Sequence, residues 1–310
     1  MAKKTFDVIA LGEAMVEFNQ TLPGRPEYLQ GFGGDTSNVV IAAARAGAKT
    51  AYLSRVGQDA FGQDLVAMWA TEGVDTRTVE QTAEAPTGIY FVTHGSTGHA
   101  FNYRRAGSAA SRMCPTWLQQ TVNTDMLANA RIFHVSGISL AISDSACDTA
   151  FVAMKLARAA GTLVSFDANF RLALWPADRA AACIRQAIAL SDIFVPSLED
   201  ITTLIGMTDV DQVVDWAHAM GARQVVLKLG GNGALVSDGA RRLRIVEHCV
   251  PTVDATGAGD CFCGNLLARL ARGDTLFEAA HYANAAAAVA VQGYGAVAPL
   301  PRPHQVRALL

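Results

Sequence analysis

The sequence predicts an α/β fold in which a doubly wound, mostly parallel sheet carries helices on both faces, with a small antiparallel β lid beside it. Three observations support this prediction: short apolar runs recur along the chain, helical patterns lie between most of them, and two stretches alternate apolar and polar residues instead. Of the 310 residues, 51% are hydrophobic and 17% are charged, which is enough for a large buried core.

The apolar runs have the form of buried parallel strands. The first runs from Phe6 to Gly12, and its terminal glycine indicates that the chain turns there. Strands are predicted at 6–12, 50–56, 131–135, 163–166, 193–195 and 224–227, and helices at 37–46, 61–72, 145–160, 211–220, 261–270 and 276–292.

Segments 13–32 and 77–105 break this pattern. Their apolar and polar residues alternate, so we interpret them as half-exposed antiparallel strands outside the main sheet, forming a lid. We find no internal repeat, low-complexity tract or linker. The sequence therefore predicts one domain spanning residues 1–310, with both lid segments inserted in it.

Composition and charge narrow the range of functions that we expect for this chain. The net charge is −3 and the basic run is limited to residues 241–244, so we expect no nucleic-acid partner. Every apolar run is shorter than the roughly 18 residues of a membrane span, and the N-terminal run is too short for a signal peptide, so we expect a cytoplasmic protein. The six cysteines and seven histidines lack the spacing of a zinc site, and buried free thiols are expected.

The most informative stretch reads D-A-T-G-A-G-D and ends at Asp260. Gly257 and Gly259 leave backbone amides unshielded at the start of an apolar helix, where unpaired N–H groups and the helix dipole attract anions. Asp260, in the first turn, directs a carboxylate into the same space and could accept a proton. The alternative is purely structural: Thr256 or Asp254 caps the helix and the glycines form a tight turn.

Two further glycine-rich stretches could contact a ligand. In G-F-G-G-D-T-S-N, Gly33 and Gly34 would let a ligand approach the backbone, with Asp35 and Asn38 directed at it; the alternative is a turn in which Asp35 or Ser37 caps the next helix. The loop K-L-G-G-N-G, residues 228–233, joins two predicted strands, and its glycines suit either a plain hairpin or a loop lying against a nucleotide.

Taken together and in this order, these motifs resemble the ribokinase-like (phosphofructokinase-B) family of sugar kinases, from Asp7 to about Pro299. The family's fold, a doubly wound α/β domain with a β lid, agrees with the pattern above. The resemblance implies an ATP- and Mg²⁺-dependent kinase, leaves dependence on K⁺ open, and implies a homo-oligomer that pairs through the lid.

The resemblance also implies roles for individual residues. Asp260 would be the base that takes the proton of the attacking sugar hydroxyl, while the amides of Gly257, Ala258 and Gly259 would stabilise the transferring phosphoryl group. The nucleotide would be bound by Ser197, Lys228, Gly231, Gly233, Thr256, Gly257, Gly259 and Asn284. For Asn284, a surface-facing helix position is the competing interpretation.

One motif departs from the family pattern. After the strand at 193–195 the family commonly has Asn-x-x-Glu, linked to magnesium and phosphate, whereas this chain has Ser197 and Asp200 in those places. A shorter carboxylate can still hold metal-bound waters, so we expect Asp200 to contact magnesium indirectly.

Two arginines indicate the sugar. Arg105 ends the lid and Arg171 follows a core strand; two guanidinium forks can hold a carboxylate, although each alone could form an ordinary ion pair. With the stretch G-E-A-M-V-E-F and Tyr90, they most resemble the 2-keto-3-deoxygluconate kinases of this family. The predicted sugar site comprises Gly33, Gly34, Asn38, Tyr90, Tyr103, Arg105, Arg171 and Asp260.

Three alternatives stay open to different degrees. A fructokinase, or another family member acting on a neutral sugar, would share the kinase motifs; Arg171 is the weaker indication of an acid sugar, because its motif D-x-N-x-R also appears in relatives acting on neutral sugars. A catalytically idle binding protein would not need Asp260. A Rossmann dehydrogenase is disfavoured because Gly12 is followed by Glu13 and Ala14 rather than by the Gly-x-Gly-x-x-Gly fingerprint.

Overall fold

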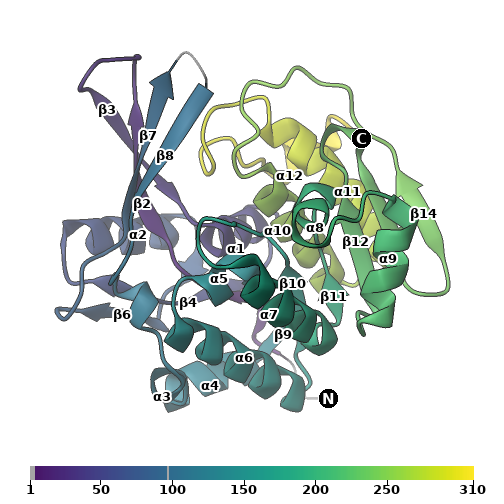
Figure 1. Cartoon of the computed structure of the whole chain (residues 1–310), viewed down its shortest axis with the longest axis horizontal. Coiled ribbons are helices and arrows are strands. Elements are labelled where there is room, and N and C mark those ends of the chain that lie inside the picture. The colour runs from purple at the N-terminus through teal and green to yellow at the C-terminus, as the bar shows by residue number, and fades with distance from the viewer. Residues whose placement is uncertain (1–3, 96–97) are drawn as a thin grey trace.

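The computed structural model describes residues 4–95 and 98–310. Within these ranges the main sheet consists of β1 (Phe6–Leu11), β4 (Thr50–Gly57), β5 (Val74–Asp75), β6 (Val79–Thr82), β9 (Ala130–Ser136), β10 (Leu163–Asp167), β11 (Ile193–Phe194), β12 (Gln224–Lys228), β13 (Ala234–Ser237) and β14 (Arg242–Ile245). Their order is β14-β13-β12-β11-β10-β9-β1-β4-β5, with β6 also paired to β4 (Figure 1). All neighbours are parallel except β12–β13 and β13–β14, so the predicted α/β fold is confirmed.

Helices cover both faces because successive strand residues point in opposite directions. In β1, Val8 packs in one apolar cluster with Val39 and Phe262, whereas Ile9 packs in another with Met154. The Val8 face is covered by α1 (Asp35–Arg45), α10 (Ala258–Arg272) and α11 (Leu276–Ala290), and the Ile9 face by α4 (Thr121–Ala128), α6 (Asp144–Ala159), α7 (Ala177–Leu190) and α9 (Val210–Ala219).

Further helices complete the body. They are α2 (Ala60–Thr71), η1 (Ala110–Arg112), α3 (Pro115–Leu118), α5 (Gly137–Ala141), α8 (Leu198–Ile205), η2 (Gly230–Asn232) and α12 (Pro303–Arg307). Among the described residues, no helix combines the length and the apolar character that crossing a bilayer requires.

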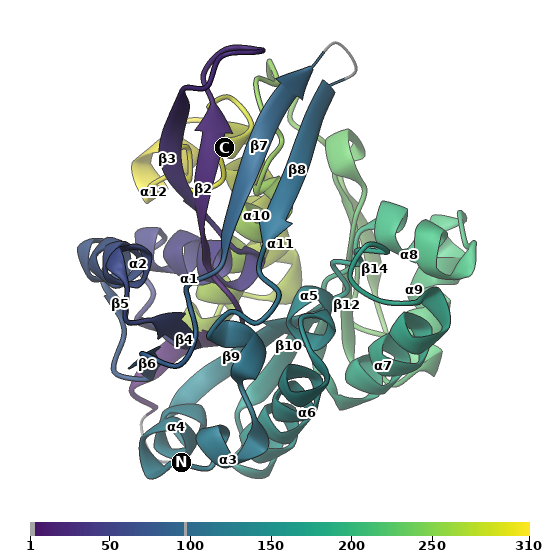
Figure 2. The same cartoon turned by 60° about the vertical axis from the view of Figure 1, so that its left-hand side comes forward.

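The lid is a separate four-stranded sheet that rises from the body (Figure 2). It contains β2 (Met15–Gln20), β3 (Tyr28–Gly33), β7 (Ile89–Gly95) and β8 (Gly98–Arg104) in the order β3-β2-β7-β8. The pairs β2–β3 and β7–β8 are antiparallel, as predicted, but the central pair β2–β7 is parallel. The lid is therefore two hairpins laid side by side.

The second lid segment is shorter than predicted. The sequence indicated residues 77–105, but Val79–Thr82 is β6, which pairs with β4 of the main sheet, and the lid strand begins only at Ile89. The pattern was misleading because a strand at the edge of the main sheet also has one exposed face, so it shows the same alternation as a lid strand.

Candidate active site

Helix α10 begins with backbone amides that no side chain caps within the described residues. Its N-cap is Gly257, in the left-handed region with φ 73°, and Ala258 is the first helical residue. Thr256 does not cap the helix, because its N–H and its hydroxyl both donate to Asp254 Oδ1, at 2.9 and 2.6 Å. The predicted cap by Thr256 or Asp254 is therefore wrong, whereas the tight turn is present, because the Ala258 N–H donates to the carbonyl of Ala255 at 3.2 Å. The absence of a side-chain cap gives the helix start the form of an anion site.

Asp260 lies in the first turn of α10 and accepts a hydrogen bond from Asn38 Nδ2 at 2.8 Å. Burial is the main cause that raises the pKa of this carboxyl to about 8, and the nearby Asp35 carboxylate adds to it. Asn38 and Lys228 act in the opposite direction. A carboxyl group that titrates near neutral pH is suited to accept a proton.

The glycines before α1 are required by close packing. Gly34 has φ 128°, and a Cβ there would lie 2.5 Å from the carbonyl oxygen of Glu13. A Cβ at Gly33 would lie 2.2 Å from the hydroxyl of Tyr90. Any side chain at either position would therefore displace the lid from the start of α1.

The polar residues of α1 face the same space as Asp260. Gly34 is the N-cap of the helix and no side chain caps it, so the suggestion that Asp35 or Ser37 does so is wrong. Asp35 instead accepts from Asn169 Nδ2 at 2.9 Å, and burial raises its pKa. The Oδ1 atom of Asn38 is buried without a partner, and a ligand hydroxyl could supply the missing donor.

Lys228 and Asp167 form a buried ion pair next to the start of α10. Lys228 ends β12 and Asp167 ends β10, and the Nζ–Oδ2 distance is 2.5 Å. Sequence reasoning missed Asp167 as a site residue, although a carboxylate directly after a buried strand was a usable signal.

The two glycines of the nucleotide loop differ. Gly233 has φ 80°, and a Cβ there would lie 2.1 Å from the carbonyl oxygen of Ile245, so packing against β14 explains it fully. Gly231 is exposed, and a Cβ there would meet nothing within 4 Å. Asn284 is buried and donates to the carbonyl of Val246 at 2.8 Å, so the surface-facing interpretation of Asn284 is wrong.

Ser197 and Asp200 lie at the start of α8. Ser197 caps that helix by accepting from the Asp200 N–H at 3.0 Å, and burial raises the pKa of the Asp200 carboxyl. Among the described residues no group of three or more His, Cys, Asp or Glu side chains is arranged to hold a metal ion. One carboxylate of this kind nevertheless fits magnesium, which usually keeps several waters and binds substrate phosphates.

Acidic residues of the lid hold the residues predicted to contact the sugar. Arg105 Nε donates to Glu13 Oε2 at 2.7 Å, and Ser108 Oγ donates to the other oxygen of Glu13 at 2.5 Å. In the same way the hydroxyl of Tyr90 donates to Glu17. Glu13 and Glu17, which are both buried, were not predicted as site residues; their signal in the sequence was two acidic residues in the otherwise apolar stretch G-E-A-M-V-E-F.

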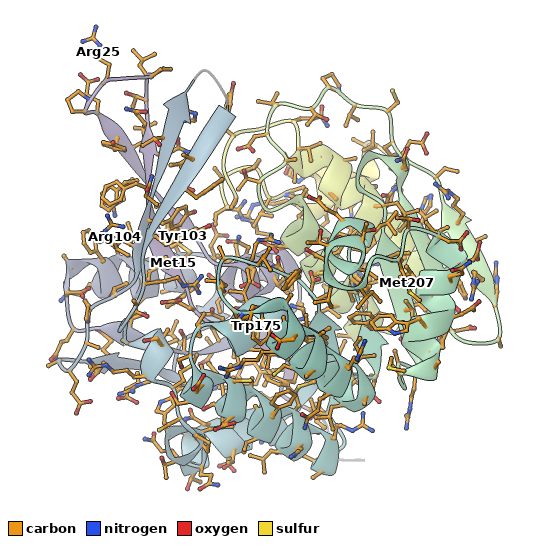
Figure 3. The ribbon with its side chains drawn as sticks, viewed as in Figure 1. Met15, Arg25, Tyr103, Arg104, Trp175 and Met207 are labelled. Carbon is orange, nitrogen blue, oxygen red and sulfur yellow. The ribbon has the colours of Figure 1, made fainter. Side chains whose placement is uncertain are left out.

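The two predicted arginines both act electrostatically on one tyrosine of the lid, and Arg105 lies 5.9 Å from the centroid of its ring. Tyr103 stacks on Tyr90 with centroids 5.5 Å apart, and Figure 3 shows it low on the lid, above the body. Burial raises the pKa of Tyr103, while Arg105 and Arg171 both lower it. Neither arginine is free, however: Arg105 pairs with Glu13, and the half-exposed Arg171 lies 3.4 Å from Asp200.

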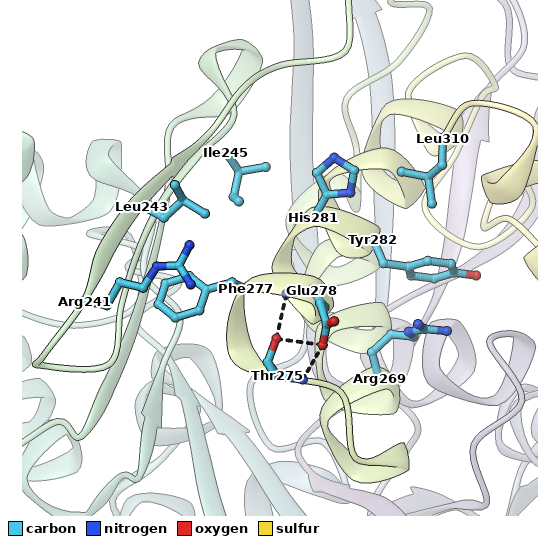
Figure 4. A pocket seen from close by; sticks show the side chains of 10 residues that line it. All are labelled: Arg241, Leu243, Ile245, Arg269, Thr275, Phe277, Glu278, His281, Tyr282 and Leu310. Carbon is cyan, nitrogen blue, oxygen red and sulfur yellow. Dashed lines mark hydrogen bonds between the residues drawn. The ribbon is translucent and has the colours of Figure 1, made fainter.

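A separate pocket of about 580 Å³ lies between β14 and the far ends of α10 and α11 (Figure 4). Arg241 covers the ring of Phe277 at 4.5 Å, and Arg269 covers the ring of Tyr282 at 4.7 Å. The site residues predicted from the sequence do not line this pocket. This pocket is therefore separate from the candidate site, which lies at the start of α10, beneath the lid.

Comparison with known proteins identifies the family. The model of the pfkB family carbohydrate kinases matches residues 5–303. The chain belongs to this family. It is a sugar kinase, in agreement with the uncapped helix start and the carboxylate of Asp260.

Named relatives show how far the similarity extends. The chain is 35% identical to a 2-dehydro-3-deoxygluconokinase of Thermoproteus tenax, covering 100% of this chain and 95% of the relative, and 33% identical to probable fructokinase-7 of Arabidopsis thaliana, covering 98% and 92%. A crystal structure from Escherichia coli, described as a ribokinase II in complex with ATP and Mg²⁺, superposes with a TM-score of 0.88 at 26% identity over 97% of this chain and 98% of that one.

Proposed function

We propose that this kinase is a single catalytic domain that transfers the γ-phosphoryl group of ATP to the terminal hydroxyl of 2-keto-3-deoxygluconate (2-dehydro-3-deoxygluconate), giving 2-keto-3-deoxy-6-phosphogluconate. The observation that carries the choice of sugar is Arg105, a guanidinium group fixed at the base of the lid with a side chain only 12% exposed. A neutral sugar needs no such cation, whereas the carboxylate of an acid sugar matches its fork. Relatives with this activity among their names support the choice.

The pairing of Arg105 with Glu13 is compatible with this role. Glu13 occupies the edge of the guanidinium formed by Nε and Nη2. Arginine carries five N–H donors, so Nη1 and the outer hydrogen of Nη2 stay directed elsewhere. Glu13 therefore fixes the orientation of the fork, and the remaining donors bind the sugar carboxylate, with Arg171 as the second cation.

In the proposed reaction Asp260 takes the proton of the terminal sugar hydroxyl. The hydroxyl oxygen then attacks the γ-phosphorus, the bond to the bridging oxygen breaks, and ADP leaves with that electron pair. Gly33, Gly34, Asn38, Tyr90 and Tyr103 hold the sugar. The amides of residues 257–259 stabilise the charge on the transferring group.

The nucleotide is proposed to lie along the carboxyl ends of β11 and β12. Asn284 and Val246 define one end of this path and the start of α10 the other. Magnesium, when bound, would supply charge neutralisation for the phosphates, and Asp200 would help to hold it through water. Turnover measured with KCl replaced by NaCl decides whether K⁺ is needed.

A second copy of the chain is the proposed partner of the lid. Leu22, Tyr28 and Leu29, on the hairpin of β2 and β3, are 55%, 37% and 68% exposed, which is unusual for side chains of this type gathered on one element. Light scattering that gives the mass of one chain at micromolar concentration would refute this pairing.

The proposed substrate is tested by an ADP-release assay with purified enzyme across acid and neutral sugars. We expect kcat/KM for 2-keto-3-deoxygluconate to exceed that for fructose by at least ~30-fold, which corresponds to about 2 kcal/mol from one charge-assisted pair. Equal turnover of fructose would replace the proposal by the fructokinase alternative, which the fructokinase relatives favour.

A further inference from the structure

The buried ion pair of Lys228 and Asp167 lies at a position that a purely structural role does not explain. The two residues end β12 and β10, which are both neighbours of β11, so the two side chains meet at the carboxyl edge of the sheet. The side chains are 12% and 5% exposed. A buried pair of this kind is seldom worth its desolvation for stability alone.

The ammonium group of Lys228 lies directly against the first turn of α10. A Cβ at Gly259 would be 3.4 Å from Lys228 Nζ, and the Sγ atom of Cys263, one turn further along, is 3.7 Å from it. The cation therefore lies beside the first turn of α10, whose start no side chain caps. A glycine at position 259 leaves the space between them open.

The charges around this turn are mostly negative. Four carboxylates face it from four elements, and the two arginines nearby are each paired to a carboxylate. Tyr90 adds a hydroxyl from the lid. The carboxylates are those of Asp35 in α1, Asp167 in β10, Asp200 in α8 and Asp260 in α10. A phosphoryl group entering this region would meet like charges unless a cation offsets them.

We propose that Lys228 is a catalytic residue of the phosphoryl transfer. Its ammonium, oriented by Asp167, contacts the oxygens of the γ-phosphoryl group together with the amides of Gly257–Gly259, and stabilises their charge while the bond to the bridging oxygen breaks. The hydroxyl proton still goes to Asp260, and ADP still leaves with the electron pair. Burial disfavours the ammonium, but Asp167 outweighs this and raises the pKa of Lys228, so the group stays charged.

The inference rests on the kinase reaction but not on the identity of the sugar. The variants are therefore assayed with whichever sugar the wild-type enzyme uses best. For Lys228→Met we expect kcat to fall by about 10²–10³, as when one donor to a developing charge is removed, with the sugar KM changed less than about threefold. Lys155→Met, which removes an exposed lysine of α6, is the matched control and should keep wild-type kcat.

A purely structural role makes a different prediction. If Lys228 only neutralises Asp167, the double variant Lys228→Met/Asp167→Asn should regain both the melting temperature and kcat, because neither charge is then left unpaired. Our proposal expects the double variant to fold and yet stay at least ~10²-fold below wild type. In the single variant Lys228→Met the acidic limb of the pH profile should also move upward, since Lys228 lowers the pKa of Asp260. A folded double variant with near-normal kcat overturns the proposal.

Discussion

The body and the lid both contribute residues to the candidate site, and these residues are held in place in different ways. In the body, the ends of β10 and β12 and the first turn of α10 place Asp167, Lys228 and Asp260 through the backbone. In the lid, Arg105 and Tyr90 are placed by side-chain bonds to Glu13 and Glu17. In the function proposed above, the chemistry thus depends on secondary structure, whereas the choice of sugar depends on pairs of side chains.

This difference indicates which half can change during evolution. A strand end or a helix start cannot move without the whole body, whereas a change at Arg105 is expected to leave the main sheet in place. This division agrees with the relatives, which share the family but are named for different sugars. The predictions below test this division.

The largest effect is expected in the body. Asp260→Asn keeps the shape of the site and the hydrogen-bonding partner of Asn38, but the amide cannot accept the hydroxyl proton. We expect kcat to fall by at least ~10³ while the dissociation constants of sugar and ATP change less than about threefold. Near-normal turnover, measured in the ADP-release assay, would remove Asp260 from the role of base.

A smaller and selective effect is expected in the lid. Arg105→Ala should lower kcat/KM for 2-keto-3-deoxygluconate by about 30-fold, because a charge-assisted pair beneath the lid is lost, and should leave ATP affinity unchanged. Arg104→Ala is the matched control, since Arg104 is exposed and should have no effect.

Removing Arg105 also leaves Glu13 buried without its cation, so stability must be measured alongside. Arg105→Lys preserves the charge and lacks the fork, and separates the two effects. If Arg105→Ala weakened ATP rather than sugar, the acid-sugar assignment and the division between lid and body would both be wrong.

The smallest effect concerns stability. The pKa of Asp260 is raised on folding from 3.8 to about 8, so the folded state holds this proton more tightly than the unfolded state does. The resulting stability is fully present below pH 3.8 and is lost as the pH rises through about 8. The asparagine of the Asp260→Asn variant cannot ionise, so the free energy of unfolding of this variant should exceed that of wild type by about 1–3 kcal/mol at about pH 9.

Urea titrations at about pH 4 and about pH 9 measure this difference. At the lower pH the two proteins should be nearly equally stable, because the wild-type carboxyl is then protonated in the folded state and near the midpoint of its titration in the unfolded state, which leaves a difference below about 1 kcal/mol. An excess stability of the variant that is the same at both pH values would show that ionisation of Asp260 is not its cause.

The sequence predicted the body better than the lid for a physical reason. Buried strands, helices and the glycines at 257 and 259 follow from local patterns, and the start of α10 lies where they indicate. The parallel pair β2–β7 and the contacts of Glu13 and Glu17 depend on register between distant strands, which alternation alone does not contain. Asp167 is an intermediate case. The strand that leads to it was predicted, and its partner Lys228 was predicted as a site residue, but the sequence did not indicate that the two side chains meet.

The two-hairpin construction of the lid has a consequence for how the protein folds. Each hairpin is local, but Glu17 and Tyr90, across the central pair, are 73 residues apart in the chain, and the elements between them belong largely to the body. Closing so long a loop costs entropy unless the intervening chain is already ordered. We therefore expect the central pair of the lid to assemble on a body that has already formed, so that the proposed sugar-recognition site is completed last.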